Sequence, residues 1–241
     1  MYISVNSLVN HMGVDEEIAR FFVDRKVPVG NSFWKGRYLY VNRGNGYVSI
    51  PVYYDLLYRL GLPKQSLLES NHVHFMEQVM HFAMLVEYRE ISFIEQLNKI
   101  SALLTETARN SPFYQELIKY LGQPEVIQMG RLGGPVNALN RADVFLFVLC
   151  DLPVSEQQVG PAIKYWYALH TSYLLMDDIE DYDMDKQEKE ENSVIELGDG
   201  INGFNRAYEI LHHNYDILRE INPLLSEHLQ IMEERLPSHA N

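Results

Sequence analysis

The stretch GPAIKYWYALHTSYLLMDDIEDYDMD (residues 160–185) decides the fold class of this chain. Its first part is apolar or aromatic at most positions, and its end is a cluster of aspartates. A surface helix carries apolar residues on one face only, so a helix over residues 160–183 that is apolar on all sides belongs among other helices. The sequence therefore predicts a mainly all-α protein in which this helix brings aspartates to the rim of a core or cavity.

Three aspartates of this stretch share one face if the segment is helical. Asp177 and Asp181 are four residues apart, Asp178 and Asp181 are three apart, and His170 and Tyr173 extend the same stripe backward. Mg²⁺ prefers oxygen ligands and is often held by one or two carboxylates together with substrate phosphates. The spacing thus predicts a site for a Mg²⁺–diphosphate complex, and the alternative is a solvated acidic helix end.

The segment HTSYLLMDDIED (residues 170–181) resembles the first aspartate-rich motif of the trans-isoprenyl diphosphate synthases, the polyprenyl synthetase family, in which a helix runs His-Thr-x-Ser-Leu-Ile-His-Asp-Asp-x-x-Asp. Two more segments are similar to that family in the same order. RLGGPVNALNRADVFLFVL (131–149) resembles its Gly-Gly-Lys-x-x-Arg-Pro segment, and ENSVIELGDGINGFNRAYEIL (191–211) resembles the linker before its next helix. The resemblance covers residues 110–220.

The resemblance implies a helical isoprenoid-synthase fold and a prenyl diphosphate as ligand. It also implies that Mg²⁺ is the cofactor, with Asp177, Asp178 and Asp181 as its ligands. For contacts to the substrate it implies the side chains of Arg141, Arg131, His170 and Tyr173.

The departures from the family concern the groups that neutralise a diphosphate. The family's Lys falls on Pro135 or Ala138, its Arg-Arg-Gly is replaced by DKQEKEEN (185–192), and no second aspartate-rich motif follows Asp199. Ionising an allylic diphosphate requires metals and Lys or Arg donors around the leaving group. We therefore expect a divergent protein that binds Mg²⁺ and a prenyl diphosphate but is not an autonomous prenyltransferase. Activity would need a partner chain in a homo- or hetero-oligomer.

The sequence pattern changes at Gly61-Leu62-Pro63, where one predicted helix ends and another begins. Residues 1–62 predict a small α+β module: two short helices around Gly13, then a β-hairpin with strands RYLYV (37–41) and YVSI (47–50). Residues 63–241 predict the partial isoprenoid-synthase-like domain, with two helices between 64 and 111 that separate near residues 88–90. Strand is expected only within 33–50.

Charge and composition exclude several classes of protein. The chain carries 20 Lys and Arg against 33 Asp and Glu, a net charge of −13, and residues 177–199 hold much of the excess. Such acidity disfavours nucleic-acid binding. Cys150 is the single cysteine, so no intramolecular disulfide forms. The apolar run 144–150 is shorter than the ~20 residues that span a bilayer, and the N-terminus lacks a signal-peptide pattern. We expect a cytoplasmic protein without a membrane span.

A second hypothesis stays open: a non-catalytic interaction or regulatory protein that keeps the helical fold, with residues 1–62 binding a partner or DNA. LVNHMGVDEEIARFF (8–22) has the spacing of a helix-turn-helix, but its second helix begins with three acidic residues, which repel phosphates. A weaker candidate for a metal site lies on a predicted helix and consists of His72, His74, Glu77 and His81.

Overall fold

The computed structural model describes residues 3–36, 40–41, 45–123 and 128–237. The helices in chain order are α1 (Val5–Asn10), α2 (Glu16–Asp24), α3 (Asn45–Arg59), α4 (Lys64–Leu67), α5 (Ser70–Glu87), α6 (Phe93–Leu103), α7 (Glu106–Arg109), α8 (Pro112–Leu121), η1 (Asn137–Asn140), η2 (Asp143–Cys150), α9 (Glu156–Glu180), α10 (Tyr182–Glu188), α11 (Ser193–Glu196), α12 (Gly200–Arg219) and α13 (Pro223–Glu233). Within the described ranges, strand-like pairing is limited to an isolated bridge between Met129 and Leu132. The predicted all-α class is confirmed.

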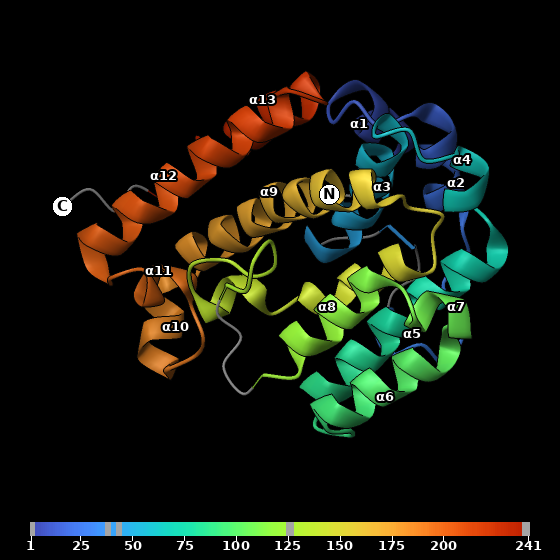
Figure 1. Ribbon diagram of the computed structural model, residues 1–241. Helices are drawn as coiled ribbons and strands as arrows, with labels where there is room; N and C mark the ends of the chain where they lie inside the picture. The colour runs from blue at the N-terminus through green and yellow to red at the C-terminus, as the bar shows by residue number, and fades with distance from the viewer. Residues whose placement is uncertain (1–2, 37–39, 42–44, 124–127, 238–241) are drawn as a thin grey trace.

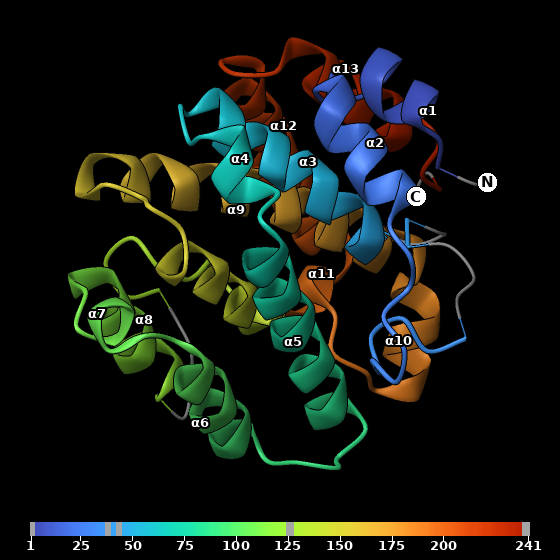
Figure 2. The ribbon, with the colours of Figure 1, turned by 90° about the vertical axis from the view of Figure 1, so that its right-hand side faces the viewer.

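Helix α9 crosses the middle of the molecule (Figure 1). It packs against α3, α11, α12 and η1, and most of its side chains between Val159 and Ile179 are buried. Figures 1 and 2 show α12 and α13 along one side of α9, and α5, α6 and α8 together on the other side. The apolar part of α9 is therefore surrounded by other helices.

Local signals in the sequence set several helix ends. Helix α3 ends at Arg59, and Gly61 follows with a φ of 90°, a conformation that glycine adopts without steric cost. Helix α5 ends at Glu87, so the predicted break near residues 88–90 is present. Helix α8 begins after Ser111, whose hydroxyl accepts a hydrogen bond from the Tyr114 N–H.

The predicted β-hairpin in residues 1–62 is wrong. Tyr47–Ile50, expected as its second strand, lies inside helix α3, while residues 37–39 and 42–44 of the first strand and the link lie outside the described residues. Aromatic and β-branched residues favour strands only where a pleated surface receives them. Here Val48, Ile50 and the residues after them are buried against other helices, so tertiary packing overrides the local preference.

The segment before α9 is more tightly wound than expected. The sequence predicts one helix over residues 136–152, and the structure has two 3₁₀ helices, η1 and η2, instead. The run VFLFVLC is rich in β-branched and aromatic residues, which lower α-helix propensity. Every residue from Asp143 to Leu149 is buried, so this segment is a core element despite its short turns.

A buried carboxylate ties the start of the chain to its C-terminal helices. Asp55 on α3 accepts hydrogen bonds from the Asp15 N–H (2.8 Å), the Arg59 Nε–H (2.6 Å) and the Asn222 amide (3.3 Å). Arg59 also donates to the carbonyls of Gly13 and Ile221. One hydrophobic core contains side chains from both sides of residue 62. The division into two domains near that residue stays a prediction.

We expect Asp55→Ala to lower the free energy of unfolding by about 3 kcal/mol, because it leaves the Asp15 N–H without an acceptor and the Arg59 guanidinium without its carboxylate, at about 1–3 kcal/mol for each unpaired donor. Denaturant unfolding followed by tryptophan fluorescence and circular dichroism measures this loss. The control is Asp216→Ala, which removes an ion pair with Arg219 whose two side chains are 72% and 50% exposed. That change should cost less than about 1 kcal/mol. Equal effects of both substitutions would contradict the structural role of Asp55.

Candidate functional site

The aspartate-rich stretch forms the C-terminal end of α9 and the start of α10. Asp177 is exposed and Asp181 is half-buried, whereas Asp178 is only 3% exposed. Successive residues on a helix are turned by about 100°, so Asp178 lies at the inner edge of the face that it shares with Asp177 and Asp181. The three carboxylates therefore have different surroundings.

Asp178 is paired inside the protein. Its Oδ1 accepts from Arg141 Nη2 at 2.8 Å, and its Oδ2 accepts from Arg141 Nη1 at 3.3 Å and from the backbone N–H of Ser193 at 2.8 Å. Burial lowers the pKa of the Arg141 guanidinium, but the hydrogen bond and charge of Asp178 raise it above its usual range. The Arg141 guanidinium therefore stays charged, and two charge-assisted hydrogen bonds pair it with Asp178.

The same position holds three helices together. The side-chain amide of Asn192 donates to the Asp178 carbonyl (2.7 Å) and to Asp185 Oδ2 (2.8 Å), while its Oδ1 caps α11 by accepting from the Val194 N–H. These contacts join α9, α10 and α11. Arg141, which directly follows η1, connects that segment to α9 through Asp178. We call Arg141, Asp178, Asn192 and Ser193 the aspartate latch.

Asp177 and Asp181 lie outside the aspartate latch. Burial and the neighbouring carboxylates of Asp181 and Asp178 raise the pKa of Asp177, and the nearby Arg141 opposes that rise. A cation near these two carboxylates would relieve their repulsion. Two carboxylates on adjacent turns are also what remains of the predicted Mg²⁺ site once Asp178 is paired with Arg141.

His170 and Tyr173 lie on α9 towards the interior, one to two turns before Asp177. The His170 ring stacks on Trp166 with 4.5 Å between ring centres. Burial, together with the charge of Arg141, lowers the pKa of His170 to about 3, so the ring is neutral. Within the described residues, neither ring nitrogen of His170 nor the Tyr173 hydroxyl has a hydrogen-bond partner. Buried polar atoms of this kind call for water or a ligand.

Arg131, the other candidate contact to a diphosphate, is engaged elsewhere. Its guanidinium binds the carboxylate of Glu116 on α8, with a shortest distance of 2.6 Å, and lies over the Phe113 ring. Arg141, in contrast, faces α9 through Asp178. The two arginines that the resemblance assigns to one ligand are therefore each paired with a different carboxylate.

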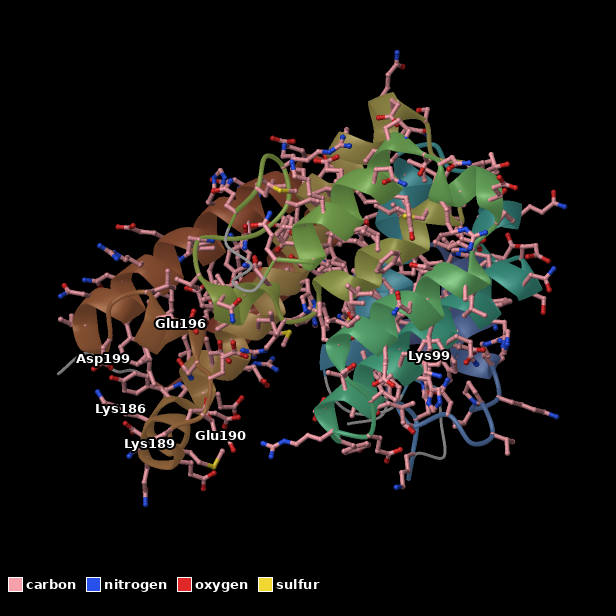
Figure 3. The ribbon with its side chains drawn as sticks, turned by 60° about the horizontal axis from the view of Figure 1, so that its bottom comes forward. Lys99, Lys186, Lys189, Glu190, Glu196 and Asp199 are labelled. Atoms are coloured by element: carbon pink, nitrogen blue, oxygen red, sulfur yellow. The ribbon has the colours of Figure 1, made fainter. Side chains whose placement is uncertain are left out.

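The acidic segment also contains its own cations. Lys186 on α10 donates to both oxygens of Asp199 at 2.8 Å and to the Tyr182 hydroxyl at 2.9 Å. The hydrogen bond from Lys186 lowers the pKa of Asp199 to about 2. Figure 3 shows Lys186, Lys189, Glu190 and Asp199 gathered at one end of the molecule, where α10 meets the start of α12. Part of the excess negative charge is thus neutralised locally.

Three polar pairings were not predicted from the sequence, although His72 and Glu77 were named there as candidate metal ligands. Asp143 accepts from Tyr120, Tyr167 and Trp166, and burial raises its pKa to about 6. His72 bridges the Tyr54 hydroxyl and Asp151, each at 2.9 Å. Arg25 binds Glu77. Each group pairs residues that are far apart in the chain, so spacing along the sequence carries no signal for them.

Among the described residues, no group of three or more His, Cys, Asp or Glu side chains is arranged to hold a metal ion. The described helices include none with the length and apolar composition that crossing a membrane requires. No family model matches the chain, and no curated protein or solved structure is significantly similar to it. The likeness to isoprenyl diphosphate synthases therefore rests on the sequence motifs alone.

Proposed function

We propose that this chain is a non-catalytic helical interaction protein, in which the aspartate-rich end of α9 stabilises the fold. The supporting observation is the pairing of Arg141 with Asp178. The resemblance assigns one of these residues to a diphosphate and the other to a metal, yet each is already satisfied by the other. A metal at Asp178 would have to compete with the Arg141 guanidinium for a carboxylate that already accepts three hydrogen bonds. Cytoplasmic location and oligomer formation remain predictions.

Breaking the pair to admit a ligand is costly. Removing one partner of a buried ion pair leaves an uncompensated charge, at about 3–5 kcal/mol. A Mg²⁺–diphosphate complex that used Asp178 and Arg141 would have to repay that loss before it gained any affinity. The proposed function avoids this cost, because the aspartate latch stays closed.

A second candidate function is binding of a Mg²⁺–prenyl diphosphate complex at Asp177 and Asp181 without transfer chemistry. The observation that favours it is that His170 and Tyr173, on the same side of α9 as Asp177 and Asp181, have buried polar atoms without a hydrogen-bond partner among the described residues. Mg²⁺ keeps most of its waters unless phosphate oxygens replace them, so binding would be stronger with the diphosphate present. This candidate leaves the aspartate latch intact and needs only the two outer carboxylates.

Titration calorimetry separates the two functions. Geranyl diphosphate with Mg²⁺ is titrated into the wild type and into Asp177→Asn/Asp181→Asn, a variant that keeps the aspartate latch. We expect the same heats for both proteins and no saturable binding. Saturable binding by the wild type that the double substitution weakens by tenfold or more would support the second candidate and contradict the first. Glu106→Gln/Glu227→Gln, at two exposed positions away from α9, makes the same change in net charge and is the control.

A further inference from the structure

A hollow of about 360 Å³ lies between α5 and the segment that follows α2. Its described lining includes Arg25, Lys26, Asn31, His74, Glu77 and His81. Figure 1 places α2 and α5 on the opposite side of the molecule from α10 and α11. The hollow shares no residue with the aspartate latch or with Asp177 and Asp181.

Arg25 is held rigidly at this hollow. Its Nε and Nη2 donate to the two oxygens of Glu77 at 2.6 and 3.0 Å, and Glu77 is buried. The guanidinium also lies between the rings of Phe21 and Tyr40, at 5.6 and 5.9 Å from their centres. Hydrogen bonds to Glu77 and an interaction with the Tyr40 hydroxyl raise the pKa of Arg25, and they leave at least one of the five N–H groups of the guanidinium as a donor. A preorganised guanidinium with a spare donor is suited to an oxyanion.

The opposite wall is fixed as well. The Asn31 amide donates to the Glu77 carbonyl at 2.8 Å, and the Ser32 N–H donates to His81 Nδ1 at 2.9 Å. Because Nδ1 accepts a hydrogen bond, the proton of the neutral His81 ring is on Nε2, which remains a donor. The loop is thus attached to α5 at two points, and the hollow does not depend on a flexible wall.

The groups around the hollow favour a negative ligand. Glu77 is neutralised by Arg25, and Lys26 is exposed without an ion pair among the described residues. Donors on Arg25, Lys26 and His81 therefore exceed the free acceptors. We propose that this hollow binds the phosphate group of a small molecule, with Arg25 and Lys26 as its main contacts.

A neighbouring hollow can hold the organic part of such a ligand. A second hollow of about 770 Å³ adjoins the first, since Arg25 and Lys26 line both. Phe21 and Leu68 add apolar surface there, and Glu17 and Asp24 add acceptors. Small-molecule sites usually combine apolar walls with a few polar groups that fix orientation. A phosphate monoester with an uncharged organic part suits this arrangement.

The test uses inorganic phosphate as the probe and amide NMR spectra of the full chain. We expect saturable shifts confined to residues 25–32 and 74–81. Lys26→Glu should weaken binding by about tenfold, because it replaces an attraction by a repulsion at close range. Lys119→Glu makes the same change in net charge at an exposed position that lines neither hollow, and it should bind as the wild type does. Arg25→Lys keeps a cation beside Glu77 but lacks the spare donor, and it should also bind more weakly.

Several outcomes would overturn the assignment. Shifts spread over all basic residues, or equal affinity in Lys26→Glu and Lys119→Glu, would mean that the hollow is not a site. Acetate binding as tightly as phosphate would contradict the choice of a phosphate group. The site uses none of the residues on which the proposed function rests, so its failure would leave that proposal standing.

Discussion

Replacing Asp178 with alanine is expected to lower the free energy of unfolding by about 3–5 kcal/mol, the typical cost of removing one partner from a buried ion pair. The substitution leaves the Arg141 guanidinium, whose side chain is 29% exposed, without its carboxylate and the Ser193 N–H without its acceptor. It also removes the charge around which α9, α10 and α11 meet. Denaturant unfolding followed by circular dichroism gives the difference directly.

The neighbouring substitution Asp177→Ala is the matched control. Asp177 is exposed, and the adjacent carboxylates contribute to the rise in its pKa, so its charge is repelled in the folded state. Removing that charge should change the free energy of unfolding by less than about 1 kcal/mol, in the stabilising direction. Two adjacent aspartates of one motif are thus expected to act in opposite directions on stability.

The contrast also tests the role of the motif. Carboxylates kept for a metal repel one another when the metal is absent, so their removal costs little in stability. If Asp178→Ala were as mild as Asp177→Ala, Asp178 would not be a structural residue and the proposed function would lose its support. A third variant, Arg141→Met, should be as damaging as Asp178→Ala. The double variant should then cost less than the sum of the two single changes.

The helical part of the fold follows from the sequence because its signals are local. An apolar segment leading into aspartates predicted α9, and Gly61 marked a helix end. The hairpin failed for the opposite reason. Residues 47–50 have strand propensity, but propensity is weak compared with burial, and this segment is buried as part of α3.

In the candidate site, too, local features could be predicted from the sequence and long-range contacts could not. Helical spacing places Asp177 and Asp181 together, and the sequence shows that spacing. The partner of Asp178 could not be read from the sequence, because Arg141 and Ser193 lie 37 and 15 residues away. A resemblance to a family supplies expected roles for Arg141 and Arg131, but it contains no information about Glu116, which binds Arg131 here.

The isolated chain is expected to condense isopentenyl and allylic diphosphates at least ~10²–10³-fold more slowly than a family enzyme, since losing a single preorganised charge contact to a developing anion costs about that much. The sequence already lacks the lysine and the arginine pair that the family pattern contains. The contacts found here add to this deficit, because Arg141 is paired with Asp178, Arg131 with Glu116, and Lys186 with Asp199. None of these cations is free to receive the diphosphate that leaves.

The assay is incorporation of radiolabelled isopentenyl diphosphate with geranyl or farnesyl diphosphate and Mg²⁺, on protein purified free of host synthases. Asp177→Ala serves as the matched variant, because it changes an outer carboxylate while the aspartate latch stays closed. Product that forms at a family rate and disappears in Asp177→Ala would show that the chain is a working prenyltransferase. In that case the pair between Arg141 and Asp178 would have to open during turnover, since a closed pair leaves the diphosphate without that arginine as a counter-charge.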